Sequence, residues 1–480
     1  MAIPEQRRHS GELVLSPSRL ARQELLPVGM EERNIGLPSF AALWLTMGAQ
    51  MGVFTLGASL AQALSPPLAL LVILIANLAM VAILVLIGDI GIEHGINFAG
   101  YLRAPFGIMG SYLPLALRGL SAIAWFGIQT YFGATAIEVV SSQFLGISAF
   151  PVWYVAFGIL QIAIVAAGIE VIRNVVNAAA PALVVLSVWL LFIMFSQASI
   201  QQFWEYPATD PQPLVVGIVA SLSYWSTVAI NVPDFTRFVK AEPSRQFFTR
   251  NRVSFIAQLI GMPTGMLFFT LVGMAGFVFT GEFNPVLAIA ALIGGAFLLL
   301  ALGVVILAQL TTNITANIYA SAYAASAIGS PRISYSRGAV ITGLMGLFLT
   351  FPWVLLDLFL TFLPVVGAAL APTAGVMLSD YYLIRRRRID VPQIFDPEGQ
   401  YRYWKGINPA SYIAWGAGAI AGITLLDYSF LVALPVALVL YYLLMRFWIL
   451  KRYRQSELTP EGRHALATSL DRNWPIRMAG

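Results

Sequence analysis

The chain has 480 residues, of which 58% are hydrophobic and 11% are charged, and its mean hydropathy is +0.77. An average soluble domain carries about 25% charged residues, so this composition excludes a water-soluble globular protein. The absence of cysteine excludes a disulfide framework, a thiolate metal site and a cysteine nucleophile, and three histidines far apart in the sequence argue against a histidine metal cluster.

Residues 1–37 are polar and lack the apolar core and cleavage site of a signal peptide. The apolar segments that follow are each long enough to cross a hydrocarbon core of ~30 Å. We expect twelve transmembrane helices, although a re-entrant hairpin near Pro352, between the ninth and the tenth, would change that count. The twelve predicted spans are 38–63, 67–90, 110–142, 150–169, 174–197, 213–233, 253–280, 295–326, 338–351, 353–384, 409–427 and 429–450.

The positions of the basic residues predict the orientation. With the N-terminus inside, every Lys and Arg falls in a predicted inner segment or in the first turns of the third span. The charged residues of the outer segments are all acids, such as Glu205 and Glu282. Cytoplasmic loops of membrane proteins are enriched in Lys and Arg. We therefore expect an inner (plasma) membrane protein with both termini in the cytoplasm, whose net charge of +5 faces anionic lipid rather than nucleic acid.

Two spans contain stretches of helix-weakening residues, Gly48–Gly52 in the first and Ser221–Thr227 in the sixth. Corresponding interruptions in two halves are typical of inverted-repeat transporters with a binding site at the membrane midplane. Five spans per half would pair the first span with the sixth and the third with the eighth. The alternative is that these small residues only allow close helix packing, and the residues alone leave both explanations open.

The third span places Trp125 and Gln129 four residues apart, on one helix face, with Gly127 leaving room for a close neighbour. An indole beside an amide suits a planar heterocycle with N–H and C=O groups on its edge. A packed tryptophan and an amide that bonds a neighbouring helix would explain the same residues equally well. Arg118 lies roughly on the same face, and we expect a structural or inner-gate role because a neutral substrate needs no charge.

In the eighth span, Asn313 and Asn317 share a face, and Thr311 and Thr312 place two hydroxyls side by side. Beside free carbonyls of a broken first helix, these hydroxyls would form an all-oxygen site for a small hard cation. The alternative is that the threonines bond back to carbonyls one turn earlier, which would not explain the asparagines.

Acidic residues within the spans are few. Asp89, Glu93 and Asp234 fall at predicted inner ends, where we expect them to pair with arginines. Glu138 and Asp357 are less easily explained, and intramembrane acids are candidate proton carriers.

Several stretches together resemble the nucleobase:cation symporter-1 family, with matches spread over residues 40–388. The resemblance implies a LeuT-like architecture of two five-helix inverted repeats plus two additional helices. The matching stretches are Tyr101–Gly107, Gly110–Arg118, Trp125–Thr130, Asn231–Arg237, Ala308–Asn317 and Ser379–Tyr382. The implied organisation is a cytoplasmic segment at 1–37, repeats at 38–197 and 198–388, a loop and two helices at 389–450, and a cytoplasmic tail at 451–480.

The resemblance implies a ring substrate between the first, third, sixth and eighth helices and a cation between the first and eighth. The substrate-binding positions are Trp125, Gln129, Trp225, Asn317 and Gln50, to which the face shared with Asn317 adds Asn313. The sodium positions are the carbonyls of Thr46, Ala49 and Ala308 and the hydroxyls of Thr311 and Thr312. Phe362 and Leu363 fall where an outer gate of the tenth helix would lie.

We therefore expect a transporter that imports a neutral planar nitrogen heterocycle by cation symport through alternating access. The Trp125–Gln129 pair resembles members that carry hydantoin, allantoin or uracil. We expect no enzymatic activity, no cofactor, sodium as the coupling ion, and a functional monomer. The alternatives are a proton-coupled permease for cytosine, another nucleobase or a vitamin precursor, and an amino-acid transporter of the same fold. A membrane-embedded enzyme would need catalytic motifs that the sequence lacks.

Overall fold

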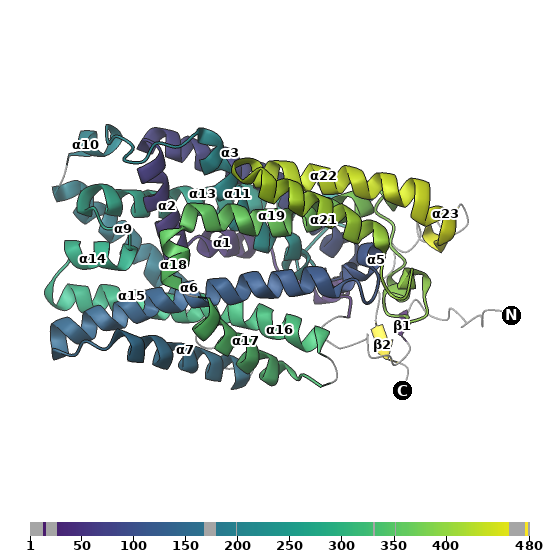
Figure 1. Ribbon diagram of the computed structural model, residues 1–480, viewed down its shortest axis with the longest axis horizontal. Helices are drawn as coiled ribbons and strands as arrows, with labels where there is room; N and C mark the ends of the chain where they lie inside the picture. The colour runs from purple at the N-terminus through teal and green to yellow at the C-terminus, as the bar shows by residue number, and fades with distance from the viewer. Residues whose placement is uncertain are drawn as a thin grey trace.

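The structure is a computed structural model that describes residues 13–15, 26–167, 179–197, 199–329, 332–350, 352–459 and 476–478. Within these ranges the chain is almost entirely helical, and two short strands, β1 (Leu13–Leu15) and β2 (Ile476–Met478), pair in parallel. Figure 1 shows most helices running along the long axis, with the strands β1 and β2 at one end and the short helices α10 and α14 at the other. The predicted fifth span begins at residue 174, and its first residues lie outside the described ranges.

The helices up to residue 197 cover the first five predicted spans. They are α1 (Leu37–Met47), α2 (Met51–Ala63), α3 (Pro66–His94), α4 (Phe98–Tyr101), α5 (Arg103–Phe106), α6 (Tyr112–Leu145), α7 (Phe150–Ala167) and α9 (Ala179–Gln197).

The helices of the next five spans end near residue 384. They are α10 (Ile200–Trp204), α11 (Leu214–Asn231), α12 (Pro233–Thr236), α13 (Phe247–Thr280), α14 (Pro285–Leu292), α15 (Gly295–Asn313), the π-helical turn η3 (Ile314–Ile318), α16 (Tyr319–Ile328), α17 (Tyr335–Leu349), α18 (Pro352–Asp357), α19 (Phe359–Leu378) and the π-helical turn η4 (Ser379–Ile384).

The last helices form an edge of the molecule, where α21 and α22 lie side by side (Figure 1). They are α20 (Val391–Ile394), η5 (Gln400–Arg402), α21 (Pro409–Thr424), η6 (Leu426–Tyr428), α22 (Ser429–Leu444), the π-helical turn η7 (Met445–Ile449), α23 (Leu450–Arg452) and η8 (Ser456–Leu458).

Every predicted span coincides with one or more of these helices. By length and composition, seven described helices can cross a membrane, or eight if the bent pair α1–α2 is one span. The number twelve therefore stays a prediction. The apolar run near Pro352 is cut as expected, because α17 ends at Leu349 and α18 begins at Pro352. Large apolar side chains such as Phe192, which is 71% exposed, face outward, as in proteins surrounded by lipid.

The first span is broken where the sequence predicts it. α1 and α2 meet at an angle of 57°, and Gln50 between them is extended, with φ −153° and ψ 153°. The predicted interruption of the sixth span is wrong, because α11 continues through Ser221–Thr227. Its serines donate to carbonyls of the helix itself, Ser221 to Gly217 at 2.8 Å and Ser226 to Ser223 at 2.6 Å, so the polar run needs no break.

α13 lies against both halves of the broken helix through glycines. A Cβ added at Gly57 of α2 would lie 2.2 Å from the carbonyl oxygen of Thr270, and one at Gly273 of α13 would lie 2.0 Å from that of Phe54. Backbones approach this closely only where side chains are absent. The contact with α13 therefore fixes the direction of α2 after the break.

Buried ion pairs tie the helix ends together at the predicted inner side. Arg250 of α13 contacts Asp89 at 2.7 Å and Glu93 at 3.0 Å, both on α3, which confirms that these acids pair with an arginine. Tyr381 donates to Glu93 at 2.8 Å and so attaches η4 to the same pair. A charge buried in this way is costly unless its partners are in place, so the cluster fixes the spacing of three helices.

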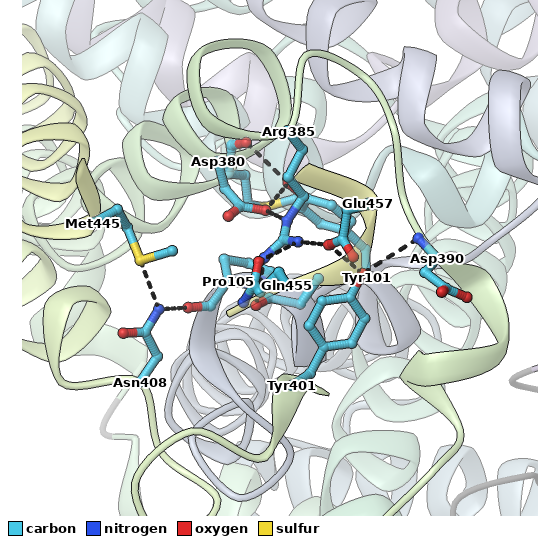
Figure 2. Close-up of polar contacts among 12 residues, drawn as sticks. Tyr101, Pro105, Asp380, Arg385, Asp390, Tyr401, Asn408, Met445, Gln455 and Glu457 are labelled. Atoms are coloured by element: carbon cyan, nitrogen blue, oxygen red, sulfur yellow. Dashed lines mark hydrogen bonds and ion pairs between the residues drawn. The ribbon is translucent and has the colours of Figure 1, made fainter. Parts of the chain in front are cut away.

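A second buried cluster attaches the segment after α23 (Figure 2). Arg385, fully buried, pairs with Asp380 at 2.6 Å and also with Glu457, which lies in η8. Tyr441 donates to Asp380 at 2.7 Å and Tyr401 to Glu457 at 2.8 Å. The described start of the predicted cytoplasmic tail is therefore packed into the protein.

The glycine contact between α2 and α13 gives a first prediction. Gly57→Ala places a methyl group against the backbone of Thr270 and should lower the free energy of unfolding by about 1–3 kcal/mol. The midpoint of thermal unfolding in detergent, followed by tryptophan fluorescence, measures this loss. Gly303→Ala on α15 is the control, since its Cβ would meet no described atom within 4 Å. Equal midpoints for the two variants would contradict the packing argument.

Candidate functional site

A cavity of about 1160 Å³ lies between helices of the first, third, sixth and eighth predicted spans. Its inner part is lined by Trp125 and Gln129 of α6 and by Trp225 of α11. From there the cavity extends to the exposed residues Glu31 and Glu32 and so reaches the protein surface before α1 begins. The four spans that are expected to surround a substrate thus lie around one cavity.

The indole of Trp125 forms the closed end of this cavity and is itself enclosed by aromatic rings. Its centroid lies 5.2 Å from Tyr224, 6.0 Å from Phe359 and 5.8 Å from Phe362, all edge-to-face. Such pairs contribute about 0.5–1.5 kcal/mol each beyond their buried area, so the ring is held in one orientation. The predicted gate residue Phe362 therefore covers Trp125 from α19, next to the buried Leu363, and neither residue is among the described cavity lining.

A chain of side-chain hydrogen bonds crosses the site through Gln129. Its Nε2 donates to Oε1 of Gln50 at 2.5 Å, and its Oε1 accepts from the hydroxyl of Thr312 at 3.1 Å. A carboxamide can donate twice and accept twice, so one N–H and one acceptor position of Gln129 remain for a ligand. The chain joins the break after α1 to α6 and α15.

The two asparagines of the eighth span have different surroundings. Asn317, in the π-helical turn η3, lines the cavity and donates to Asn313 Oδ1 at 2.8 Å. Asn313 is not among the described lining residues, because its amide donates to Phe126 O at 3.1 Å and to Gln161 Oε1 at 2.8 Å. In this structure Asn313 joins α15 to α6 and α7 and orients Asn317, and a direct contact of Asn313 with substrate stays a prediction.

Trp225 supplies a second aromatic surface on the cavity wall. Its Nε1 donates to Asn77 Oδ1 of α3 at 3.1 Å, and its ring lies 5.9 Å from that of Trp44. The hydrogen bond satisfies the indole N–H, so a face of the ring is available to the cavity without leaving a buried polar group unpaired.

The five predicted sodium positions lie on two elements beside the cavity. Thr46, Thr311 and Thr312 line it, whereas Ala49 and Ala308 are each 1% exposed. The hydroxyl of Thr311 donates to Ala308 O at 3.1 Å. The single hydroxyl hydrogen of Thr312 is shared between Ala308 O, at 2.7 Å, and Gln129 Oε1, at 3.1 Å. The hydroxyl hydrogens therefore make the back-bonds of the alternative explanation, while lone pairs of both hydroxyl oxygens remain available to a cation. The donor set contains only oxygen, which suits a hard monovalent cation.

Polar groups continue along the cavity toward its mouth. Arg118 lines the wall two turns from Trp125, and its Nη2 donates to Ala316 O at 3.3 Å. Its Nε and Nη1 have no hydrogen-bond partner in the described part of the chain. Asp234 also lines the cavity and accepts from the backbone N–H of Phe98 at 2.8 Å.

The two acids considered as proton carriers lie away from the cavity in this structure. Glu138 accepts from the hydroxyl of Ser148 and, at 2.9 Å, from the N–H of Ala149, so it caps the start of α7. Asp357 is exposed at the end of α18. Neither residue belongs to the described cavity lining.

Three residues near Trp125 were missed from the sequence. Tyr224 precedes Trp225, Phe359 lies three residues before Phe362 on the same helix face, and a Cβ on Gly52 would approach Trp125 to 3.1 Å. The i, i+3 spacing of Phe359 and Phe362 is a signal that could have been used. Whether Tyr224 and Gly52 lie near Trp125 depends on how α11 and α2 face α6, and no residue spacing in the sequence predicts that orientation.

Comparison with known proteins agrees with this geometry. Residues 27–450 match the family model described as permease for cytosine/purines, uracil, thiamine, allantoin. The hydantoin permease of Microbacterium maritypicum is 30% identical over 436 residues, which cover 89% of each chain.

Two solved structures of Mhp1, a nucleobase-cation-symport-1 family transporter, superpose over nearly the whole chain. The inward-facing conformation gives a TM-score of 0.87 at 28% identity and covers 97% of this chain and 100% of that one. The closed conformation with bromovinylhydantoin bound gives 0.83 at 29% identity and covers 94% and 99%. The chain therefore belongs to the nucleobase:cation symporter-1 family of permeases and is a membrane transporter with a LeuT-like fold.

Proposed function

We propose that this transporter imports a neutral planar nitrogen heterocycle of the hydantoin, allantoin or uracil class together with one Na⁺. The observation that carries the proposal is the placement of Trp125 and Gln129 on one face of α6, at the closed end of the cavity. The relative that carries hydantoin and the bromovinylhydantoin-bound neighbour support this class of ring.

The chemistry of the wall fits such a ring. Trp125 and Trp225 offer indole faces on which a flat ring stacks, and Gln129 and Asn317 offer amides that match alternating N–H and C=O groups. Gln129 keeps one donor and one acceptor after its bonds to Gln50 and Thr312, which is what one imide edge requires. A charged substrate would instead need a counter-charge beside Trp125.

The cavity shape supports alternating access with this conformation facing inward. Phe359 and Phe362 of α19 cover Trp125 on one side, while the other end reaches the surface at Glu31 and Glu32. The inward-facing neighbour has the higher TM-score of the two Mhp1 conformations. In the outward-facing state, α19 would move away from Trp125 and the wall near Arg118 would close. We propose that both termini are cytoplasmic and that a monomer suffices, because the cavity lies within one chain.

The link between the two sites supports sodium coupling. A cation held by carbonyls at the α1 break and by the hydroxyls of Thr311 and Thr312 would draw α1 and α15 together. The same two elements hold Gln129 through Gln50 and Thr312, so cation binding would organise the ring site. Each ligand then raises the affinity of the other by the same factor. One charge moving through 100 mV contributes about 2.3 kcal/mol, which supports roughly 50-fold accumulation.

A proton-coupled permease for cytosine or a vitamin precursor is the second candidate. Asp234 on the cavity wall is the observation that favours it, because a carboxylate reached by water can carry a proton. An amino-acid transporter of this fold would need a cation facing the substrate carboxylate, and the family match argues against it.

Binding of ring compounds tests the substrate site. For purified protein with Na⁺, we expect hydantoin, allantoin or uracil to quench tryptophan fluorescence, and Gln129→Leu to raise Kd about 5- to 150-fold because it removes a buried amide. Trp125→Ala should abolish most of the quenching. Trp404→Ala, which removes a tryptophan that is 53% exposed and outside the cavity, is the control. Unchanged quenching in Trp125→Ala would overturn the assignment.

The sodium dependence of that binding tests the coupling ion. Thr311→Val keeps the side-chain shape but removes the hydroxyl, so it should raise the half-saturating Na⁺ concentration at least tenfold. Thr424→Val is the matched control, because Thr424 makes the same back-bond, to Ile420 O at 2.8 Å, on an exposed helix face. Affinity that is equal in Na⁺ and K⁺ but rises as the pH falls would favour the proton-coupled candidate instead.

A further inference from the structure

A second cavity, of about 170 Å³, lies at the ends of α3 and η4, on the predicted inner side. It is walled by the segment before α1, the end of α3, the loop between α12 and α13, and the loop after η4. Arginines outnumber glutamates six to two on this wall. The arginines are Arg33, Arg245, Arg250, Arg386, Arg387 and Arg388.

The acids on this wall do not neutralise the arginines. Glu93 is already engaged by Arg250 at 3.0 Å, and Arg250 also contacts Asp89 at 2.7 Å. The second glutamate, Glu242, is exposed to solvent. Arg33 and the three arginines at 386–388 therefore give the cavity an excess of positive charge.

Three of the arginines are displayed by a strained turn. Arg386 and Arg387 have φ values of 52° and 64°, a left-handed conformation that residues other than glycine rarely adopt. The turn is held by Arg387 N–H donating to Tyr381 O at 2.7 Å and by the His94 ring, which contacts Arg387 O at 3.1 Å. None of Arg386, Arg387 and Arg388 forms an ion pair with a residue that the structure describes.

The turn is also anchored from the protein interior. Arg385, directly before it, is fixed between Asp380 and Glu457 (Figure 2). The buried arginine thus holds one end of the turn while the next three residues face the cavity. Backbone strain maintained by such supports is typical of functional sites.

Arg33 provides a second, independent observation. Its side chain is only 7% exposed, and Nη1 donates to Ile92 O at 2.5 Å. Its Nε has no hydrogen-bond partner among the described residues. A buried guanidinium N–H that lacks an acceptor is costly unless a ligand supplies one beside it.

We propose that this cavity binds a phosphate group. Guanidinium groups match phosphate oxygens with paired N–H donors and keep their charge at all physiological pH values. Basic pockets on the inner side of membrane proteins accept the headgroups of anionic lipids, and free phosphate presents the same oxygens. In this proposal Arg33 and the arginines of the 386–388 turn both donate to the phosphate oxygens.

Thermal unfolding of the full-length, delipidated protein in detergent tests the proposal. The midpoint is followed while inorganic phosphate is added at constant ionic strength, with chloride as the reference, and separately with short-chain phosphatidylglycerol against phosphatidylcholine. We expect a saturable rise with phosphate or with phosphatidylglycerol. Arg386→Gln combined with Arg388→Gln should raise the half-saturating concentration at least tenfold. Both side chains lie on an accessible turn, so the variant should still fold.

The control is Arg332→Gln combined with Arg337→Gln, two exposed arginines at the predicted inner side. A response to inorganic phosphate identifies a free anion as the ligand, and a response to phosphatidylglycerol alone identifies a lipid headgroup. An equal response to chloride, or an equal loss in both double variants, would overturn the proposal. Because no ring compound is used, the outcome is independent of the proposed transport function.

Discussion

The amide of Gln129 is the interaction on which the rest of the site depends. It accepts from Thr312 and donates to Gln50, so one side chain couples α6 to α15 and to the break after α1. In a lipid-surrounded interior an unpaired amide costs several kcal/mol. The helices therefore keep positions in which both bonds are made or in which a ligand replaces them. Asn313 and Gln161 extend this requirement to α7 and keep Asn317 at the cavity wall.

The broken helix can take part in such a site only because another helix supports it. α13 follows α1 and α2 on both sides of the bend, and glycines at Gly57 and Gly273 bring the backbones together. Side-chain contacts are thus replaced by backbone contacts, which cannot rotate away. Around the break short-range bonds replace the regular helical pattern, from Ala49 N–H to Thr46 O and from Gln50 N–H to Gly48 O, both at 2.9 Å, and the rigid support keeps this segment in place beside the cavity.

Much of the fold could be predicted from the sequence, because long apolar segments and one-sided basic loops are strong signals. Trp125 and Gln129 followed from their four-residue spacing. The sixth span was misjudged because serine lowers helix propensity in general, whereas Ser221 and Ser226 donate to their own helix. The bonds of Asn313 could not be predicted from the sequence, because its partner Gln161 lies 152 residues earlier in the chain. The role of Glu457 was invisible for the same reason, because its partner Arg385 lies 72 residues earlier.

The segment Pro27–Met30 lines both the large cavity and the small basic one. It is attached to the end of α3 by the bond from Val28 N–H to Gly95 O, at 2.9 Å. This one segment of the chain therefore separates two cavities whose linings differ in chemistry. Deleting the chain up to Met30 would merge the two cavities into one opening bordered by arginine side chains.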